Sequence, residues 1–307
     1  MSIRALVGRG LIATAVIATT MVGTAVAAEA AVSTLEVKAG RLVLEPGARG
    51  YVGSLPVTIT YRGDAPDYAN FTFVEPVAGA FDGLTPSDAC LYLNLVDGRR
   101  GITCGVPGGD LKPGKRRHFT IDFEVLTTPR PYAMQAADTT VDVSLGSQPD
   151  VRATASSKTL FRSTTGTLVR PRPYVQDTQS DITVTTGNAT LTAQEDGTYA
   201  GRVPVTIHWA GDAPHEELTA QIQIPSGFDW IGTDPSEPCA GNWCSVPGGR
   251  FMAGETRTFD LLATAPAEAV PGTVGTGSVS ISTNWRGNSL PDVDPSDNTA
   301  PFTLTVG

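Results

Sequence analysis

The chain has 307 residues, of which 17% are charged and 40% hydrophobic, with 33 Gly, 23 Pro and four Cys. This length predicts about two domains, and low charge with many turn-forming residues favours short strands over long helices or coiled coils. The net charge of −9 argues against general nucleic-acid binding, because the phosphates would be repelled.

Residues 1–27 are typical of a secretory signal peptide. Arg4 and Arg9 form the positive start, an apolar segment runs from Leu11 to Val22, and Ala25-Val-Ala27 is a small-residue cleavage site. A retained transmembrane anchor is the alternative, but the apolar segment is short for a membrane span. We therefore expect an exported chain, secreted or associated with the cell wall, without a transmembrane segment after cleavage.

A segment near the start of the chain occurs again 148 residues later. Tyr51–Pro66 reads YVGSLPVTITYRGDAP, and Tyr199–Pro214 reads YAGRVPVTIHWAGDAP. Further on, Cys104-Gly-Val-Pro-Gly-Gly109 recurs as Cys244-Ser-Val-Pro-Gly-Gly249, at an offset of 140. Two matches in the same order predict a duplicated domain. The predicted parts are copies at residues 33–163 and 180–307, joined by an extended Pro/Arg-rich connector at 164–179.

Each copy contains short β-branched segments separated by turns. The first ones, Val57–Tyr61 and Val205–Trp209, both end in Gly-Asp-Ala-Pro. About seven strands per copy, at turn spacings of about ten residues, are typical of a β-sandwich. We predict an all-β chain of two tandem immunoglobulin-like antiparallel β-sandwiches. The later expected strands are Phe71–Val74, Phe119–Val125 and Thr140–Leu145 in the first copy, and Leu218–Ile224, Phe259–Leu262, Ser278–Ser282 and Phe302–Val306 in the second.

The turn motifs of the second copy resemble those of a bacterial family. Ile224-Pro-Ser-Gly-Phe228 precedes the cysteines and the Ser-Val-Pro-Gly-Gly249 loop, and Asp294-Pro-Ser-Asp-Asn298 precedes the last strand. This order is similar to that of the immunoglobulin-like conserved repeat domains of bacterial surface proteins and of the related adhesion-associated domains. The first copy departs from it, with Gln148-Pro-Asp-Val151 before its last strand. The resemblance implies a non-catalytic spacer, scaffold or adhesive module, with no family-wide active site.

The four cysteines fall into one pair per copy, Cys90 with Cys104 and Cys239 with Cys244. These spacings are too short for the inter-sheet bridge of antibody domains, and they suit a link across a local hairpin. A zinc site is the alternative, but no further Cys or clustered His completes four ligands. A redox role needs a Cys-x-x-Cys pair, which the sequence lacks. Export therefore predicts two structural disulfides.

An acidic cluster near the end of the chain is a weak calcium candidate. Asp292, Asp294 and Asp297 offer hard oxygen ligands in an extracellular setting. The spacing and terminal Glu of an EF-hand are missing, and Asp residues also accept backbone hydrogen bonds in turns. We therefore expect a turn here and no metal or other cofactor.

All four tryptophans lie in the second copy. Trp209 replaces Tyr61 at a repeated strand position, so we expect it in the core. Trp243 lies between the paired cysteines and Trp285 in a turn, so both are expected to be exposed. Exposed aromatic side chains on a secreted β-sandwich suit stacking on sugar rings or contact with a protein.

Charge is divided unevenly between the copies. Residues 33–163 hold 14 Lys/Arg and 14 Asp/Glu, whereas residues 180–307 hold four and 15. The bases of the first copy suggest a patch for an anionic partner. The simpler interpretation is that these bases lie in solvated loops and have little effect. The six residues of this predicted patch are Arg99, Arg100, Lys112, Lys115, Arg116 and Arg117.

These features together predict a secreted, non-enzymatic surface or matrix module that acts as a scaffold, spacer or adhesin-like binding protein. Its expected partner is a cell-envelope polymer or a surface protein, and the sequence leaves the oligomeric state open. Carbohydrate binding through Trp243 and Trp285 is the alternative. A secreted hydrolase assembled from distant residues is a third, since no recognisable catalytic motif surrounds His118, His208 or His215.

Overall fold

Residues 34–307 are described by the structure, a computed structural model, and they consist of β-strands joined by turns and loops. The predicted signal peptide lies outside the described residues. The described part contains no helix, and so none that could span a membrane. The predicted all-β class is confirmed.

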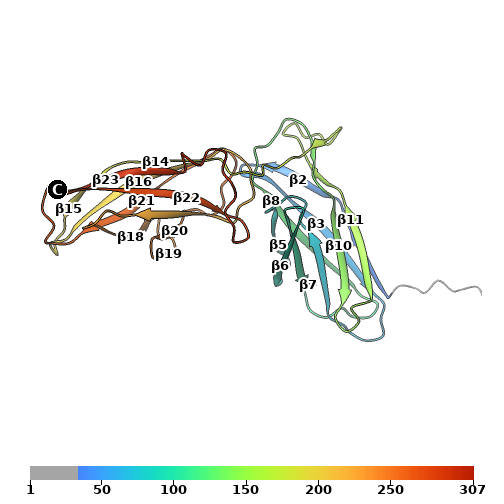
Figure 1. Cartoon of the computed structure of the whole chain (residues 1–307). Coiled ribbons are helices and arrows are strands. Elements are labelled where there is room, and N and C mark those ends of the chain that lie inside the picture. The colour runs from blue at the N-terminus through green and yellow to red at the C-terminus, as the bar shows by residue number, and fades with distance from the viewer. Residues whose placement is uncertain (1–33) are drawn as a thin grey trace, which may run out of the picture. The chain divides into compact units, whose positions relative to one another are not determined.

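Strands β1–β13 form the first sandwich. One sheet has the order β13-β9-β12-β2-β3-β8-β5 with β1 also on β3, and the other has the order β11-β10-β4-β7-β6. Figure 1 labels β2, β3, β5 and β8 of the first sheet and β6, β7, β10 and β11 of the second. The strands are β1 (Leu35–Ala39), β2 (Leu42–Gly47), β3 (Gly50–Tyr61), β4 (Ala69–Val74), β5 (Phe81–Thr85), β6 (Cys90–Val96), β7 (Arg99–Gly105), β8 (Arg116–Val125), β9 (Met134–Gln135), β10 (Thr139–Leu145), β11 (Arg152–Ser157), β12 (Thr159–Phe161) and β13 (Arg172–Pro173).

Strands β14–β23 form the second sandwich, in which one hydrogen-bonded path runs β18-β21-β16-β15-β23-β22-β17-β20-β19, with β14 also on β16. The strands are β14 (Ile182–Thr186), β15 (Ala189–Ala193), β16 (Tyr199–Trp209), β17 (Glu217–Gln223), β18 (Asp229–Asp234), β19 (Cys239–Ala240), β20 (Trp243–Ser245), β21 (Glu255–Ala265), β22 (Val274–Asn284) and β23 (Thr299–Val306).

The two sandwiches share one strand order. β1 to β8 correspond in sequence and in pairing to β14 to β21, β10 corresponds to β22, and β11 with β12 corresponds to β23. Pairing is antiparallel except for β2 with β12, β15 with β23, and β9 with β13. Every strand expected from the sequence lies within an observed strand or overlaps one.

Alternation along the strands builds one apolar core in each sandwich. On β3, Leu55, Val57, Ile59 and Tyr61 are buried while the residues between them face outward. Trp209 occupies the place of Tyr61 in the second sandwich and is fully buried, as expected.

Part of the predicted connector is ordered against the first sandwich. β13 (Arg172–Pro173) pairs with β9, and the ring of Tyr174 stacks on Phe161 with centroids 4.9 Å apart. Residues of segment 164–179 therefore extend the first sheet.

Candidate functional site

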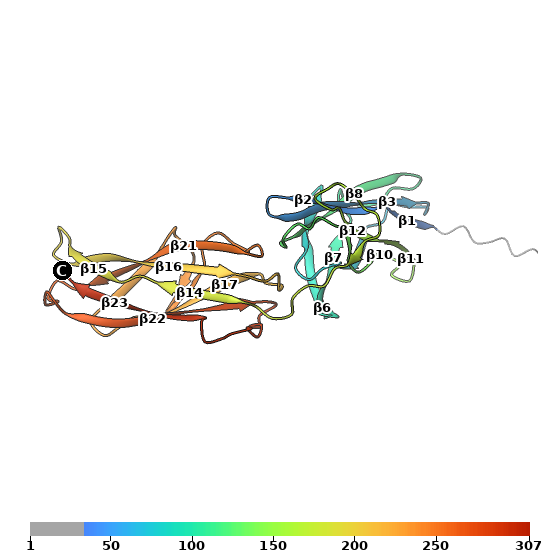
Figure 2. The ribbon, with the colours of Figure 1, turned by 90° about the horizontal axis from the view of Figure 1, so that it is seen from above.

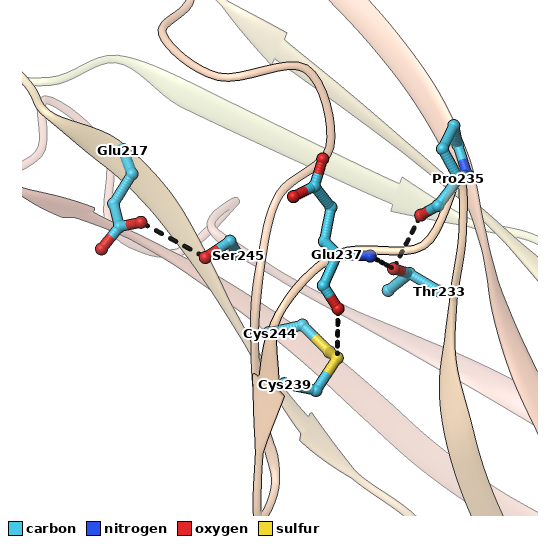
Figure 3. The surroundings of a disulfide bond; sticks show 7 residues. All are labelled: Glu217, Thr233, Pro235, Glu237, Cys239, Cys244 and Ser245. Atoms are coloured by element: carbon cyan, nitrogen blue, oxygen red, sulfur yellow. Dashed lines mark hydrogen bonds between the residues drawn. A yellow bond between two sulfur atoms is a disulfide. The ribbon is translucent and has the colours of Figure 1, made fainter.

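Each sandwich contains one disulfide, which joins directly opposed residues of a hairpin. Cys90 of β6 is bonded to Cys104 of β7, and Cys239 of β19 to Cys244 of β20. Figure 3 shows the second bridge, with the carbonyl oxygen of Glu237 3.4 Å from the Cys239 sulfur. The predicted pairing and its place across a local hairpin are confirmed.

The bridged hairpin of the first sandwich is longer than its counterpart in the second. β6 and β7 have seven residues each, whereas β19 has two and β20 has three. The β6–β7 turn contains Asp97 and Gly98, with φ of 51° and 76°. Asp-Gly adopts this left-handed pair in two-residue hairpin loops. The extra residues between the first two cysteines therefore build a strand, β6, that is reduced to two residues in the second sandwich.

A buried ion pair fixes this hairpin near its turn. The Nε and Nη2 groups of Arg100 donate to the Glu75 carboxylate at 3.0–3.1 Å, and Glu75 is fully buried. The same carboxylate accepts the backbone N–H groups of Gly79, Phe81 and Arg100. Both charges are thus well partnered, as burial requires. The disulfide and the ion pair hold β7, while β6 pairs with β7 alone.

β6 presents a row of exposed apolar side chains. Leu91 is 70% exposed, and Tyr92, Leu93, Leu95 and Val96 are 44–46% exposed. These side chains lie on both faces of the sheet, since Leu91 is paired with the half-buried Thr103 and Tyr92 with the core residue Ile102. Several exposed apolar side chains on one edge strand indicate an interaction site, whereas isolated ones are ordinary. With β4, β7 and β10, the strand also lines a groove of about 740 Å³.

The free edge of β6 lacks the charges found on comparable edges. β6 is the last strand of its sheet (Figure 2), and Cys90–Val96 contains no charged residue, Pro or Gly. Two other edge strands, β5 and β18, carry Asp82 and Asp229, and each is broken by a bulge. Charge, bulges and short length are the usual protections of an edge strand. β6 has only a bulge, so its edge is open to an added strand.

The structure does not bring the six predicted basic residues into one patch. The first two lie at the start of β7, and the other four lie beyond its far end, in the loop before β8 and on β8. Arg100 is 5% exposed and ion-paired, so its predicted exposure in an anionic-partner patch is wrong. Arg99 is half-buried and donates to the Glu75 carbonyl at 3.2 Å. Lys112, Lys115 and Arg116 are exposed.

Arg117 hydrogen-bonds to the backbone of the loop that precedes it. Its Nη1 donates to the carbonyls of Pro107 and Gly109, and its Nη2 donates to the carbonyl of Asp110 at 3.1 Å. A guanidinium held by three backbone carbonyls closes the turn and leaves few donors for a ligand. Its position therefore favours a structural role.

The two tryptophans expected at the surface differ in exposure. Trp243 is 43% exposed, but Trp285 is 5% exposed, so the expected exposure of Trp285 is wrong. The ring of Trp285 lies 5.3 Å from the guanidinium carbon of Arg100, where a cation meets an aromatic face favourably. Trp243 alone remains available for a glycan or protein contact.

The acidic cluster organises turns, as expected. Asp292 Oδ2 accepts the hydroxyl of Ser180 at 2.8 Å, and Asp294 Oδ1 accepts the backbone and the hydroxyl of Ser296. These bonds lower the pKa of Asp294. Among residues 34–307, no group of three His, Cys, Asp or Glu side chains could hold a metal ion.

The histidines bond to backbone and hydroxyl groups. His215 is buried, its Nε2 accepts the N–H of Phe251 at 2.8 Å, and its Nδ1 lies 3.2 Å from the carbonyl oxygen of Ala213. Burial lowers the pKa of His215 to about 4, so the ring is neutral at pH 7. His118 and His208 bond to threonine hydroxyls on neighbouring strands.

Sequence reasoning missed β6 and Glu75. The available signal for β6 was the apolar run Leu91–Val96, which has no counterpart between the cysteines of the second copy. No local signal identifies Glu75, because its partner Arg100 lies 25 residues away.

Comparisons with solved structures give many matches, and those named here have low sequence identity and low TM-scores. No protein-family model matches the chain, and no curated protein matches it. The CupB6 tip adhesin of Pseudomonas aeruginosa is 10% identical over 89% of this chain and 97% of its own, with a TM-score of 0.30. The C-terminal domain of the AgI/II polypeptide BspA of Streptococcus agalactiae is 9% identical over 89% and 100%, with a TM-score of 0.27. Red sea bream transglutaminase is 12% identical over 89% and 31%, with a TM-score of 0.22. Similarity this low identifies neither a family nor a function.

Proposed function

We propose that the chain is an extracellular, non-catalytic scaffold or adhesin-like module that binds a protein partner along β6. The observation that carries the proposal is an uncharged, apolar edge strand held in place by Cys90–Cys104 and, through β7, by Glu75–Arg100. A strand that is already ordered loses little conformational entropy when a partner strand adds to it.

Two further observations support an extracellular role. Disulfides form and persist in oxidising compartments, so two disulfides fit an exported chain. The turn motifs that resemble the bacterial surface-repeat and adhesion-associated domains lie in loops of a confirmed β-sandwich. We include membership of that family in the proposal.

Retention of the purified chain on protein fractions of the cell envelope tests this function. The variant Leu91→Lys/Leu93→Lys places two charges at exposed positions of β6, and Ile231→Lys is the control for a charge added to another edge strand, β18. We expect the β6 variant to lose retention and the control to keep it. Equal retention of both variants, or turnover of substrates on a hydrolase panel, would contradict the proposal.

Carbohydrate binding is a second candidate, favoured by Trp243. This ring is exposed on β20 within the short disulfide loop, and a held aromatic face suits a sugar ring. Trp243→Ala should then abolish binding on a glycan array while retention through β6 is unchanged. No glycan binding by the unaltered chain would exclude this candidate.

A further inference from the structure

We infer that the partner strand is β6 of a second copy, so that two chains pair antiparallel along β6 about a two-fold axis. This inference rests on the proposed function and specifies its partner. The free edge of β6 is the surface that both copies would contribute.

Main-chain geometry allows the pairing. β7 is the one strand that pairs with β6, so the backbone groups on the other side of β6 face no strand of the first sandwich. Antiparallel addition across a two-fold axis uses the same edge of both copies. Since each copy offers one such edge, the assembly closes at two chains and does not grow into a fibre.

The composition of β6 favours an identical strand. Leu91–Val96 reads LYLNLV, without charge, Pro or Gly, and short neutral segments of high β-propensity pair readily with copies of themselves. Equal numbers of bases and acids in residues 33–163 add no net repulsion between two first sandwiches. The second sandwich has four bases and 15 acids, so the second sandwiches of two copies would repel each other. Contact through the first sandwich is therefore the electrostatically favourable arrangement for two copies.

Two arginines already cover part of Tyr92. The guanidinium of Arg100 lies 4.6 Å from the ring centroid and that of Arg286 lies 5.3 Å from it. Arg286 also donates to the Leu93 carbonyl at 3.2 Å. Leu91, Leu95 and the Leu93 side chain are therefore the groups most available for burial between copies.

The apolar area sets the strength of the dimer. Complete burial of the exposed parts of the five large apolar side chains would remove on the order of 500 Å² per copy, so about 1,000 Å² for a pair is the upper limit of the apolar contact. Stable specific interfaces begin at about this size. The dimer should therefore be weak, with dissociation in the micromolar range or above.

Sedimentation velocity of the full purified chain, from about 1 to about 200 µM, tests the inference. We expect a reversible monomer–dimer equilibrium that Leu91→Lys/Leu93→Lys weakens at least about tenfold, because edge lysines oppose strand pairing. Ile231→Lys should leave it unchanged. Because the contact is apolar, raising NaCl from about 50 to about 500 mM should not weaken it.

Three results would overturn self-pairing: a monomer at all concentrations, a dimer equally stable in the β6 variant, or assemblies that grow beyond two chains. Equal thermal midpoints of the two variants would show that both remain folded. If the chain stays monomeric but is retained on envelope protein through β6, the self-pairing is contradicted and the proposed function is not. Loss of both behaviours contradicts the proposed function as well.

Discussion

Arg117 and Arg257 close the same loop in the two sandwiches with the same hydrogen bonds. They lie 140 residues apart, the spacing of the Pro-Gly-Gly loop that each one holds. Arg257 also pairs with Glu255 and lies over the ring of Phe251. The carbonyls that accept from the two guanidiniums belong to residues 107, 109 and 110 in the first sandwich and 247, 249 and 250 in the second.

Replacing Arg117 by Ala should destabilise the first sandwich by about 1–3 kcal/mol, because three carbonyls lose a charged donor. Urea unfolding monitored at equilibrium measures the change. Arg116→Ala is the matched control, since Arg116 is exposed, and it should shift the midpoint little. Equal effects of the two substitutions would show that the loop bonds are not stabilising.

Arg100→Met should cost about 3–5 kcal/mol, because it leaves the Glu75 carboxylate buried without its cation. Replacing both partners, Glu75→Leu with Arg100→Met, should cost less than the single change. Limited proteolysis should cut the β6–β7 hairpin faster in the single variant. A double variant less stable than the single one would contradict a desolvation origin.

Acid should weaken the second sandwich through His215. The folded-state pKa of about 4 lies below the ordinary histidine pKa of 6.5, so the unfolded chain binds the proton more readily. The stabilising effect of the neutral ring is complete above pH 6.5 and is lost as the pH falls toward about 4. Between about pH 7.5 and about pH 5 the loss should be about 2 kcal/mol.

His215→Gln keeps an acceptor for the Phe251 N–H without a group that titrates in this range. The change in urea midpoint between the two pH values should therefore be smaller in the variant than in the unaltered chain. An identical pH dependence of both proteins would assign the effect to other groups.

The exposed bases before β8 give a separate prediction about anionic partners. Reversing Lys112, Lys115 and Arg116 to Glu should reduce retention of the chain on an anionic envelope polymer. The retention that remains should depend less on the NaCl concentration. Reversal of the exposed Arg41, Arg130 and Lys158 changes the net charge by the same amount and is the control. Retention that falls equally in both variants would show a general charge effect and no specific site.

The sequence predicts the fold well because its evidence is local and repeated. Alternating β-branched residues such as Val57 and Ile59 determine which face of a strand is buried. The short spacing between Cys239 and Cys244 likewise limits them to a local hairpin. Each of these features depends on neighbours within a few residues.

The candidate site was less predictable because it depends on distant partners. Arg100 looks like a surface base until the fold places Glu75 beside it, and Trp285 looks like a loop residue until its ring is covered. The exposure of the apolar side chains on β6 follows in part from sheet order, since β6 has a neighbouring strand on one side alone. Sheet order is a property of the whole fold.

Hydrogen exchange at the β6 amides tests the central claim most directly. The amides of Leu91–Val96 that do not bond to β7 should become protected when the chain binds its partner, whether envelope protein or a second copy at high concentration. Amides of the comparable edge strand β18 should be unaffected. Unchanged exchange along β6 under conditions where binding is complete would contradict the claim that β6 is the binding edge.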